Sequence, residues 1–139
     1  MLGVLVICHR QMATYMKDSI CGIVGEQEYF EAIEVLPSDG IEGTEKKISN
    51  VLAKWDKIKN IIVFVDIFGG TPCNASAKFF RKVQGSGLNV DIISGVNLPI
   101  ILTTLSQRNS FEDLNEFSEK VINESKKNRF ESILQGEKN

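Results

Sequence analysis

An apolar run that ends in an acidic, glycine-rich turn constrains the fold of this chain more than any other feature. Residues 60–65 (Asn-Ile-Ile-Val-Phe-Val) have the pattern of a short strand that is covered on both faces. Asp66 follows directly, and a glycine pair at 69–70 lets the backbone approach a ligand closely. We interpret Thr71 as the N-cap and Pro72 as the first residue of the next helix. The free N–H groups of such a helix start can bind an anion such as phosphate.

Strands and helices alternate along the whole chain. Apolar or alternating runs predict strands at residues 2–8, 29–36, 60–65 and 89–94. The strand at 29–36 has mixed polarity and is expected at or near an edge of the sheet. Helical spacing predicts helices from Met12 to a stop at Gly25, from a cap at Asp39 to Trp55, from 72 to 82, from 100 to 106, and from a cap at Ser110 to Ile122. This alternation predicts a doubly wound α/β fold, with a mainly parallel four-stranded sheet and helices on both faces.

Three helix starts carry recognisable capping signals. Asp39 followed by Glu42 resembles a capping box, and Ser110 is paired with Asp113 in the same way. Asn97 stands two residues before a proline and reads as the N-cap of the fourth helix.

The composition excludes several classes of protein. A chain of 139 residues is expected to form a single domain, and its formal charge of −2 argues against nucleic acid as a partner. No apolar run approaches the roughly 20 residues of a membrane span, and the N-terminus reads as a strand rather than a signal peptide. Three cysteines without a Cys-x-x-Cys pair fit reduced thiols, and a single histidine signals no metal site. Phosphate-binding P-loop and dinucleotide motifs are absent, so no cofactor is predicted.

The candidate site lies where the strands end. Because the carboxyl ends of parallel strands meet at one edge, His9, Asp66 and the turn at 95–97 are expected at the same edge. A lone histidine is more often a capping or packing residue, but a facing aspartate favours a functional one. A carboxylate bonded to Nδ1–H would leave the Nε2 lone pair free as a nucleophile toward a phosphoryl group. The helix start at Thr71 would then hold the phosphoryl charge.

Two other readings of the residues stay open. Cys73 lies in the first turn of a helix and could form a Cys-His-Asp set with His9 and Asp66, as in a hydrolase. Cys8 is expected to point away from His9, because adjacent strand residues face opposite sides. Arg10 is either an ordinary surface charge or a group that attracts a phosphoryl group or an acidic partner.

The motifs together resemble one known family. Histidine at the end of the first strand, Asp66-x-x-Gly69-Gly70-Thr71-Pro72-x-Asn74-Ala75, and Gly95-Val96-Asn97-Leu98-Pro99 are similar to the mannose-family enzyme IIA of the bacterial sugar phosphotransferase system. The resemblance covers residues 1 to about 125. It departs at Arg10, because the family usually has a small residue, often glycine, directly after the histidine.

The resemblance implies a cytoplasmic phosphocarrier that needs no cofactor. His9 would take a phosphoryl group on Nε2 from phospho-HPr and pass it to the matching IIB component, ahead of the membrane components IIC and IID. Asp66 would orient His9, and Gly70 and Thr71 would bind the phosphoryl oxygens. The expected docking residues around this site are Arg10, Phe68, Asn97 and Leu98. A phosphocarrier subunit of dihydroxyacetone kinase and a regulatory module that senses phosphorylation are the alternatives.

The resemblance also implies a homodimer that exchanges a C-terminal strand. The chain would then divide into an α/β domain at 1–125 and a tail at 126–139, with the exchanged strand around residues 129–134. Phe130, Ile133 and Leu134 would give that strand apolar surface to bury.

Overall fold

The computed structural model describes residues 1–129 and 136. This part of the chain contains, in order, β1 (Leu2–His9), α1 (Met12–Val24), β2 (Phe30–Val35), α2 (Gly40–Leu52), β3 (Asn60–Val65), α3 (Thr71–Lys82), β4 (Asn89–Ser94), α4 (Leu98–Gln107) and α5 (Leu114–Glu124). All four predicted strands and all five predicted helices are present. No helix among the described residues is long and apolar enough to cross a bilayer.

The four strands form one parallel sheet in the order β2-β1-β3-β4. The chain therefore reverses its winding direction after β2, which places β1 and β3 side by side at the centre. The predicted doubly wound α/β class is confirmed, and so is the edge position of the strand at 29–36. The edge opposite β2 is formed by β4.

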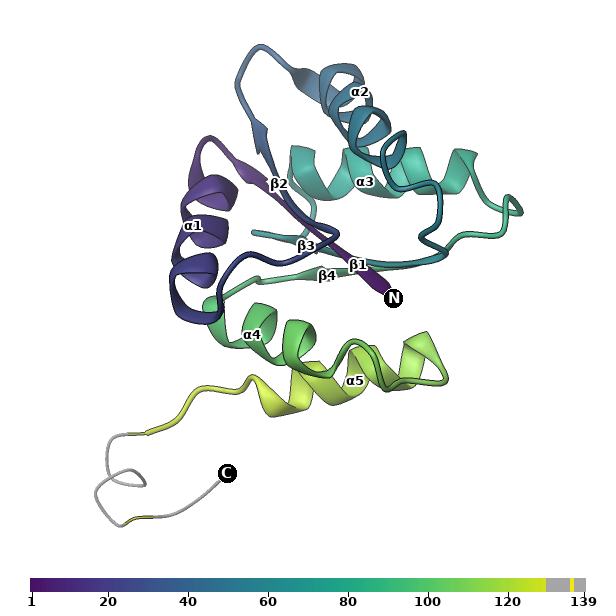
Figure 1. The fold of residues 1–139 in the computed structure, drawn as a ribbon. Coiled ribbons are helices and arrows are strands. Elements are labelled where there is room, and N and C mark those ends of the chain that lie inside the picture. The colour runs from purple at the N-terminus through teal and green to yellow at the C-terminus, as the bar shows by residue number, and fades with distance from the viewer. Residues whose placement is uncertain (130–135, 137–139) are drawn as a thin grey trace.

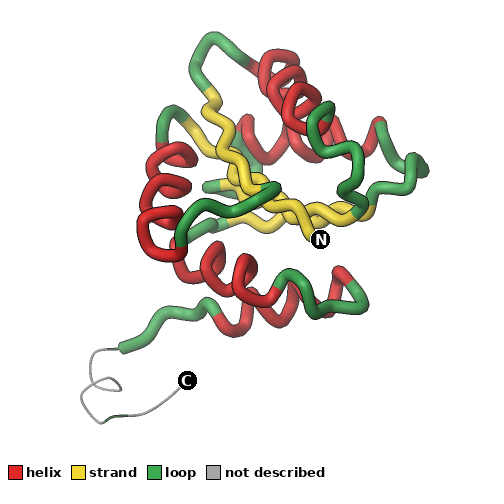
Figure 2. Tube along the Cα trace, in the orientation of Figure 1, coloured by secondary structure: helices red, strands yellow, loops and turns green. Residues whose placement is uncertain are grey.

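Helices cover both faces of the sheet, as Figures 1 and 2 show. The helices α2 and α3 lie over one face, and α1, α4 and α5 lie over the other. Side chains alternate along β1: Val4 and Val6 join the core beneath α1, α4 and α5, whereas Leu5 and Ile7 join the core beneath α2 and α3. His9 is two residues after Ile7, so the alternation of side chains along the strand directs it to the same face, toward α3.

Two predicted helix starts are wrong in detail, and at a third, Asp39, the residue is the N-cap of α2 but its side chain does not cap the helix. Gly70, with extended φ and ψ, is the N-cap of α3, so Thr71 is the first helical residue and not the cap. The Asp39 carboxylate makes no capping bond, because it accepts from the backbone N–H of Leu36 and from Lys47 Nζ, both at 2.7 Å. The last helix begins at Leu114 and is capped by Asp113, four residues later than a cap at Ser110 would give.

Some apolar residues that fit the helical spacing are exposed in the structure. Ile20 of α1 is fully buried, but Met12 is 41% exposed and Ile23 is 61% exposed. Trp55 lies beyond the end of α2 and packs over Gly3. A Cβ added to Gly3 would lie only 2.8 Å from the indole ring. These residues fit the helical spacing, yet tertiary contacts decide which of them are covered.

The predicted exchange strand around residues 129–134 lies almost entirely outside the described residues. The division into a domain at 1–125 and a tail at 126–139 therefore stays a prediction, as does strand exchange.

Candidate functional site

His9 and Asp66 meet at the carboxyl edge of the sheet. His9 is the last residue of β1, and Asp66 directly follows β3, which pairs with β1 through Ile7 and Val65. Oδ2 of Asp66 lies 2.7 Å from Nδ1 of His9 and also accepts the backbone N–H of His9 at 2.9 Å. Oδ1 accepts the backbone N–H of Ile67 at 2.9 Å. The carboxylate therefore fixes both the ring and the backbone of the histidine.

The chemistry of this contact assigns the tautomer of His9. An ionised carboxylate only accepts hydrogen bonds, so Nδ1 carries a proton, and in the neutral ring Nε2 is then the nitrogen with the lone pair. Burial raises the pKa of Asp66, but the hydrogen bonds from the backbone and ring of His9 and from the backbone of Ile67 outweigh it, so its pKa lies below the ordinary value. Asp66 thus stays ionised while its side chain is only 9% exposed, whereas the His9 side chain is 44% exposed and can meet a partner.

The start of α3 lies against the imidazole. A Cβ added to Gly70 would be 2.8 Å from Cε1 and 3.4 Å from Nε2 of His9. Any larger residue at this position would have to displace the His9 ring, although the extended backbone angles of Gly70 would accept one. No side chain caps α3, and Pro72 has no N–H, so Thr71 and Cys73 supply the uncapped N–H groups of its first turn, which suit an anion. Thr71, the first residue of α3, makes no hydrogen bond through its hydroxyl within the described residues.

Asn74 holds the glycine turn in place. Its side-chain amide donates to the Gly69 carbonyl at 2.9 Å, and its backbone N–H donates to the Gly70 carbonyl at 2.9 Å. Gly69 has a φ of 84°, which favours glycine. We assigned Asn74 no role from the sequence, although it belongs to the motif quoted above. An asparagine four residues after a glycine pair is the signal that could have suggested this bond.

The predicted docking residues have different surroundings. Phe68 is 86% exposed on the turn after β3, and its neighbour Ile67 is 57% exposed. Leu98 is half-buried and packs against the core beneath α1, α4 and α5. Asn97 caps α4, as predicted, by accepting the Ile100 N–H at 2.9 Å. Among these, Phe68 is the side chain that offers the most apolar surface to a partner.

The exposed Arg10 directly follows His9 and has a left-handed backbone. Its φ is 55°, and its N–H donates to the Val35 carbonyl at 2.8 Å, which turns the chain away from the sheet. No ion pair of its guanidinium is formed within residues 1–129.

The cysteines are placed for packing. Cys8 is fully buried on the opposite face from His9, as predicted, and burial, together with the charge of Asp66, raises its pKa to about 12. Cys73 lies in the first turn of α3, and its half-buried side chain packs against the core beneath α2 and α3. The described residues contain no cluster of three or more histidine, cysteine or acidic side chains that could hold a metal ion.

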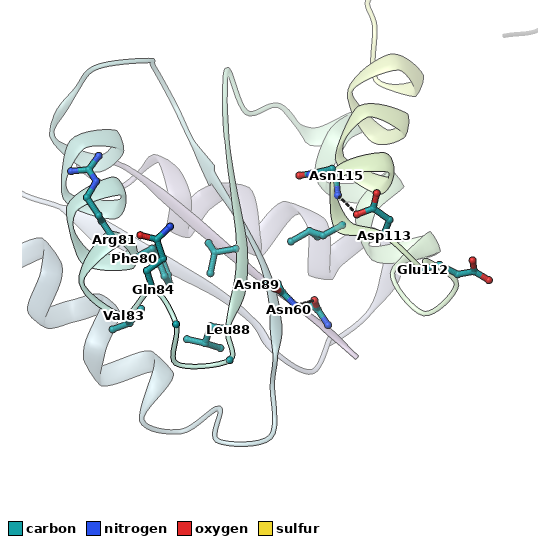
Figure 3. Close-up of a pocket in the computed structure, with 14 residues that line it drawn as sticks. Asn60, Phe80, Arg81, Val83, Gln84, Leu88, Asn89, Glu112, Asp113 and Asn115 are labelled. Carbon is teal, nitrogen blue, oxygen red and sulfur yellow. Dashed lines mark hydrogen bonds between the residues drawn. The ribbon is translucent and has the colours of Figure 1, made fainter.

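A polar cavity of about 900 Å³ lies at the other end of the sheet (Figure 3). Asn60 and Asn89 at the amino ends of β3 and β4 contribute to it, with Arg81 in the last turn of α3, Gln84 after that helix, and Asp113 before α5. None of the predicted site residues lines this cavity. The candidate site at His9 is therefore on an exposed surface and not in this cavity.

Comparisons with known proteins agree on one family. The family model described as "PTS system fructose IIA component" matches residues 3–122. The fructose-specific EIIA component of Bacillus subtilis (strain 168) is 34% identical over 108 residues, which are 78% of this chain and 71% of that protein. The mannose-specific EIIAB component of Escherichia coli (strain K12) is 28% identical over 116 residues, and the match spans only 35% of that longer protein. The crystal structure of an EIIA component from Streptococcus agalactiae superposes with a TM-score of 0.79 at 25% identity, covering 90% of this chain and 92% of the other.

Proposed function

This chain belongs to the fructose- and mannose-type EIIA family of the sugar phosphotransferase system, and from that membership we propose that it carries phosphoryl groups on Nε2 of His9. The observation that carries the proposal is the 2.7 Å contact between Nδ1 of His9 and Asp66, with Nε2 beside the uncapped start of α3. The donor would be phospho-HPr and the acceptor a IIB component, in the cytoplasm. The membrane components IIC and IID would follow in the same system.

The transfer requires no proton to leave His9. The Nε2 lone pair forms the new N–P bond while the N–P bond of the donor phosphohistidine breaks and its electron pair stays on the donor nitrogen. A donor ring that is protonated on its other nitrogen leaves as neutral imidazole. The His9 ring becomes cationic, with its proton still on Nδ1, and the Asp66 carboxylate 2.7 Å away stabilises that charge. The same steps in reverse pass the phosphoryl group to the acceptor.

Gly70 and Thr71 would bind the phosphoryl oxygens. The free N–H groups at the start of α3 and the positive end of its dipole favour the negative charge. The Thr71 hydroxyl is free to donate a further hydrogen bond. Phe68, with Arg10, Asn97 and Leu98, would form the surface on which HPr and IIB dock in turn.

The proposal is tested by phosphorylation with phosphoenolpyruvate, enzyme I and HPr. We expect label that is labile in acid and stable in alkali on the wild type and on Cys73→Ser, and no label on His9→Ala. Label that disappears with Cys73→Ser, or a wild type that stays unlabelled with several HPr sources, would contradict the proposal.

We also propose that the full chain is a homodimer that exchanges its C-terminal strand. The support is a groove of about 640 Å³ along β4, the edge strand, lined by Asp91 to Ser94 and by Ile122 of α5. Sedimentation of the full chain and of a chain truncated after Ser125 tests this proposal. A full chain that sediments as a monomer at micromolar concentration would contradict it.

A further inference from the structure

Two residues other than glycine have a left-handed backbone among the described residues, Arg10 and Tyr29, with φ of 55° and 51°. Such a backbone is unfavourable for a residue that carries a Cβ. Tyr29 has a structural reason to be there, because its ring packs edge-on against Trp55 with 5.9 Å between centroids. Arg10 has no comparable reason.

The fold uses only the backbone of Arg10. Its N–H bond to the Val35 carbonyl would be made equally well by glycine, which adopts this conformation without strain. The side chain is exposed and forms no hydrogen bond or ion pair within residues 1–129. A strained residue that the fold does not need is a candidate for a functional one.

Three other charged groups near this edge have partners of their own. Asp66 is bonded to His9, Lys47 is bonded to Asp39 at 2.7 Å, and Glu34 accepts a hydrogen bond from the Thr14 hydroxyl at 2.7 Å. Arg10 directly follows His9, with about 3.8 Å between consecutive Cα atoms, and its exposed side chain is long compared with that separation. A guanidinium presents paired N–H donors that match two oxygens of a phosphoryl group.

We propose that Arg10 is a ligand of the phosphoryl group on His9, and that it stabilises the phosphorylated form of this protein. The inference rests on the proposed phosphorylation of His9. When the N–P bond to Nε2 forms and the donor N–P bond breaks, the transferred group keeps its negative oxygens. The Arg10 guanidinium then donates to these oxygens, and no covalent bond to Arg10 forms or breaks.

An equilibrium measurement separates this role from docking. The equilibrium constant for phosphoryl exchange between phospho-HPr and this protein depends only on the free proteins and not on their complex. A residue that acts only in docking therefore changes KM and leaves the equilibrium constant unchanged. The strain of Arg10 is present in both phosphorylation states and cancels in the same way.

The experiment uses the full chain with wild-type HPr and the variants Arg10→Gly, Arg10→Asn and Arg10→Lys. Arg81→Gln is the matched control, because Arg81 is an exposed arginine at the other end of the sheet. We expect the equilibrium constant to fall about five- to tenfold in Arg10→Gly and Arg10→Asn, less in Arg10→Lys, and less than twofold in Arg81→Gln. The ³¹P resonance of the phosphohistidine should shift in Arg10→Gly and stay in place in Arg81→Gln.

Thermal unfolding provides the check on folding. Arg10→Gly should have a Tm at or above that of the wild type, because the left-handed strain is removed. An unchanged equilibrium constant in Arg10→Gly, with the wild type fully phosphorylated, would overturn the inference and leave Arg10 as a docking residue. A wild type that accepts no phosphoryl group would overturn the proposed function together with it.

Discussion

The imidazole of His9 lies directly against the backbone of Gly70, so closely that a Cβ on Gly70 would come within 2.8 Å of Cε1. The same hypothetical Cβ would lie 3.2 Å from Cγ1 of Ile67. The ring therefore occupies space that exists because residue 70 has no side chain. Together with the Asp66 carboxylate, this contact defines where Nε2 lies relative to α3.

Gly70→Ala should displace the ring and slow phosphorylation of His9 by more than about tenfold, a loss above 1.4 kcal/mol in transition-state stabilisation. The backbone of residue 70 is extended, so the variant should still fold with a Tm near the wild-type value. Single-turnover transfer from phospho-HPr measures the effect. Gly69→Ala is the control: it introduces left-handed strain at φ 84° but no atom lies within 4 Å of its Cβ. Equal rate losses in both variants would contradict the steric explanation.

Asp66→Asn should remove a pH dependence of stability. The pKa of Asp66 is held below its ordinary value of 3.8 in the folded protein. Its contribution to the free energy of unfolding is therefore complete above pH 3.8 and is lost as the pH falls through the folded-state pKa. Urea unfolding of the wild type between pH 6 and pH 2 should show this loss, and the Asn variant should lack this part of it. Parallel curves for the two proteins would contradict the assigned pKa direction.

Phe68→Ala should weaken docking without affecting the fold. The side chain is 86% exposed, so truncation removes little buried surface and the Tm should be unchanged. Loss of an aromatic anchor costs about 1–2 kcal/mol at a protein interface, which corresponds to a KM for phospho-HPr raised about tenfold. Ile23→Ala is the matched control, because Ile23 is 61% exposed near the C-terminal end of α1, whereas His9 lies just before the start of that helix. A raised KM in both variants would indicate a general effect of surface hydrophobicity.

Asn97→Ala should destabilise the protein by about 1 kcal/mol, because the cap of α4 is lost. For a domain of this size, that loss lowers the Tm by about 4 °C. Asn97→Asp keeps an acceptor for the Ile100 N–H and should retain the wild-type Tm. Differential scanning calorimetry distinguishes these outcomes, and a low Tm in both variants would show that the amide has another structural role.

The central contact of the site could be predicted because it follows from topology. A strand that ends in His9 and another that ends in Asp66 come together once β1 and β3 are neighbours, and strand ends are well marked by apolar runs. The order of the strands was the condition for this prediction, and the structure meets it.

Capping and close packing could not be predicted in the same way. Asp39 has the spacing of a capping residue, but Lys47 and the Leu36 N–H compete for its carboxylate. Thr71 has the chemistry of a cap, but the chain enters α3 through Gly70. Such choices depend on which groups tertiary structure brings within reach. The contact between Gly70 and His9 is of this kind, since the two residues lie far apart in the sequence and meet only in the folded sheet.

The pairing of β1 with β3 has a further consequence for how the protein assembles. The Asp66 carboxylate and the His9 ring are 57 residues apart in sequence and meet only when the two central strands are in register, Ile7 opposite Val65. Displacing one strand by a single residue would turn every side chain to the wrong face and separate the pair. Competence to accept a phosphoryl group is thus a reporter of completed sheet formation, and stopped-flow refolding coupled to phosphorylation would time the moment when the centre of the sheet closes.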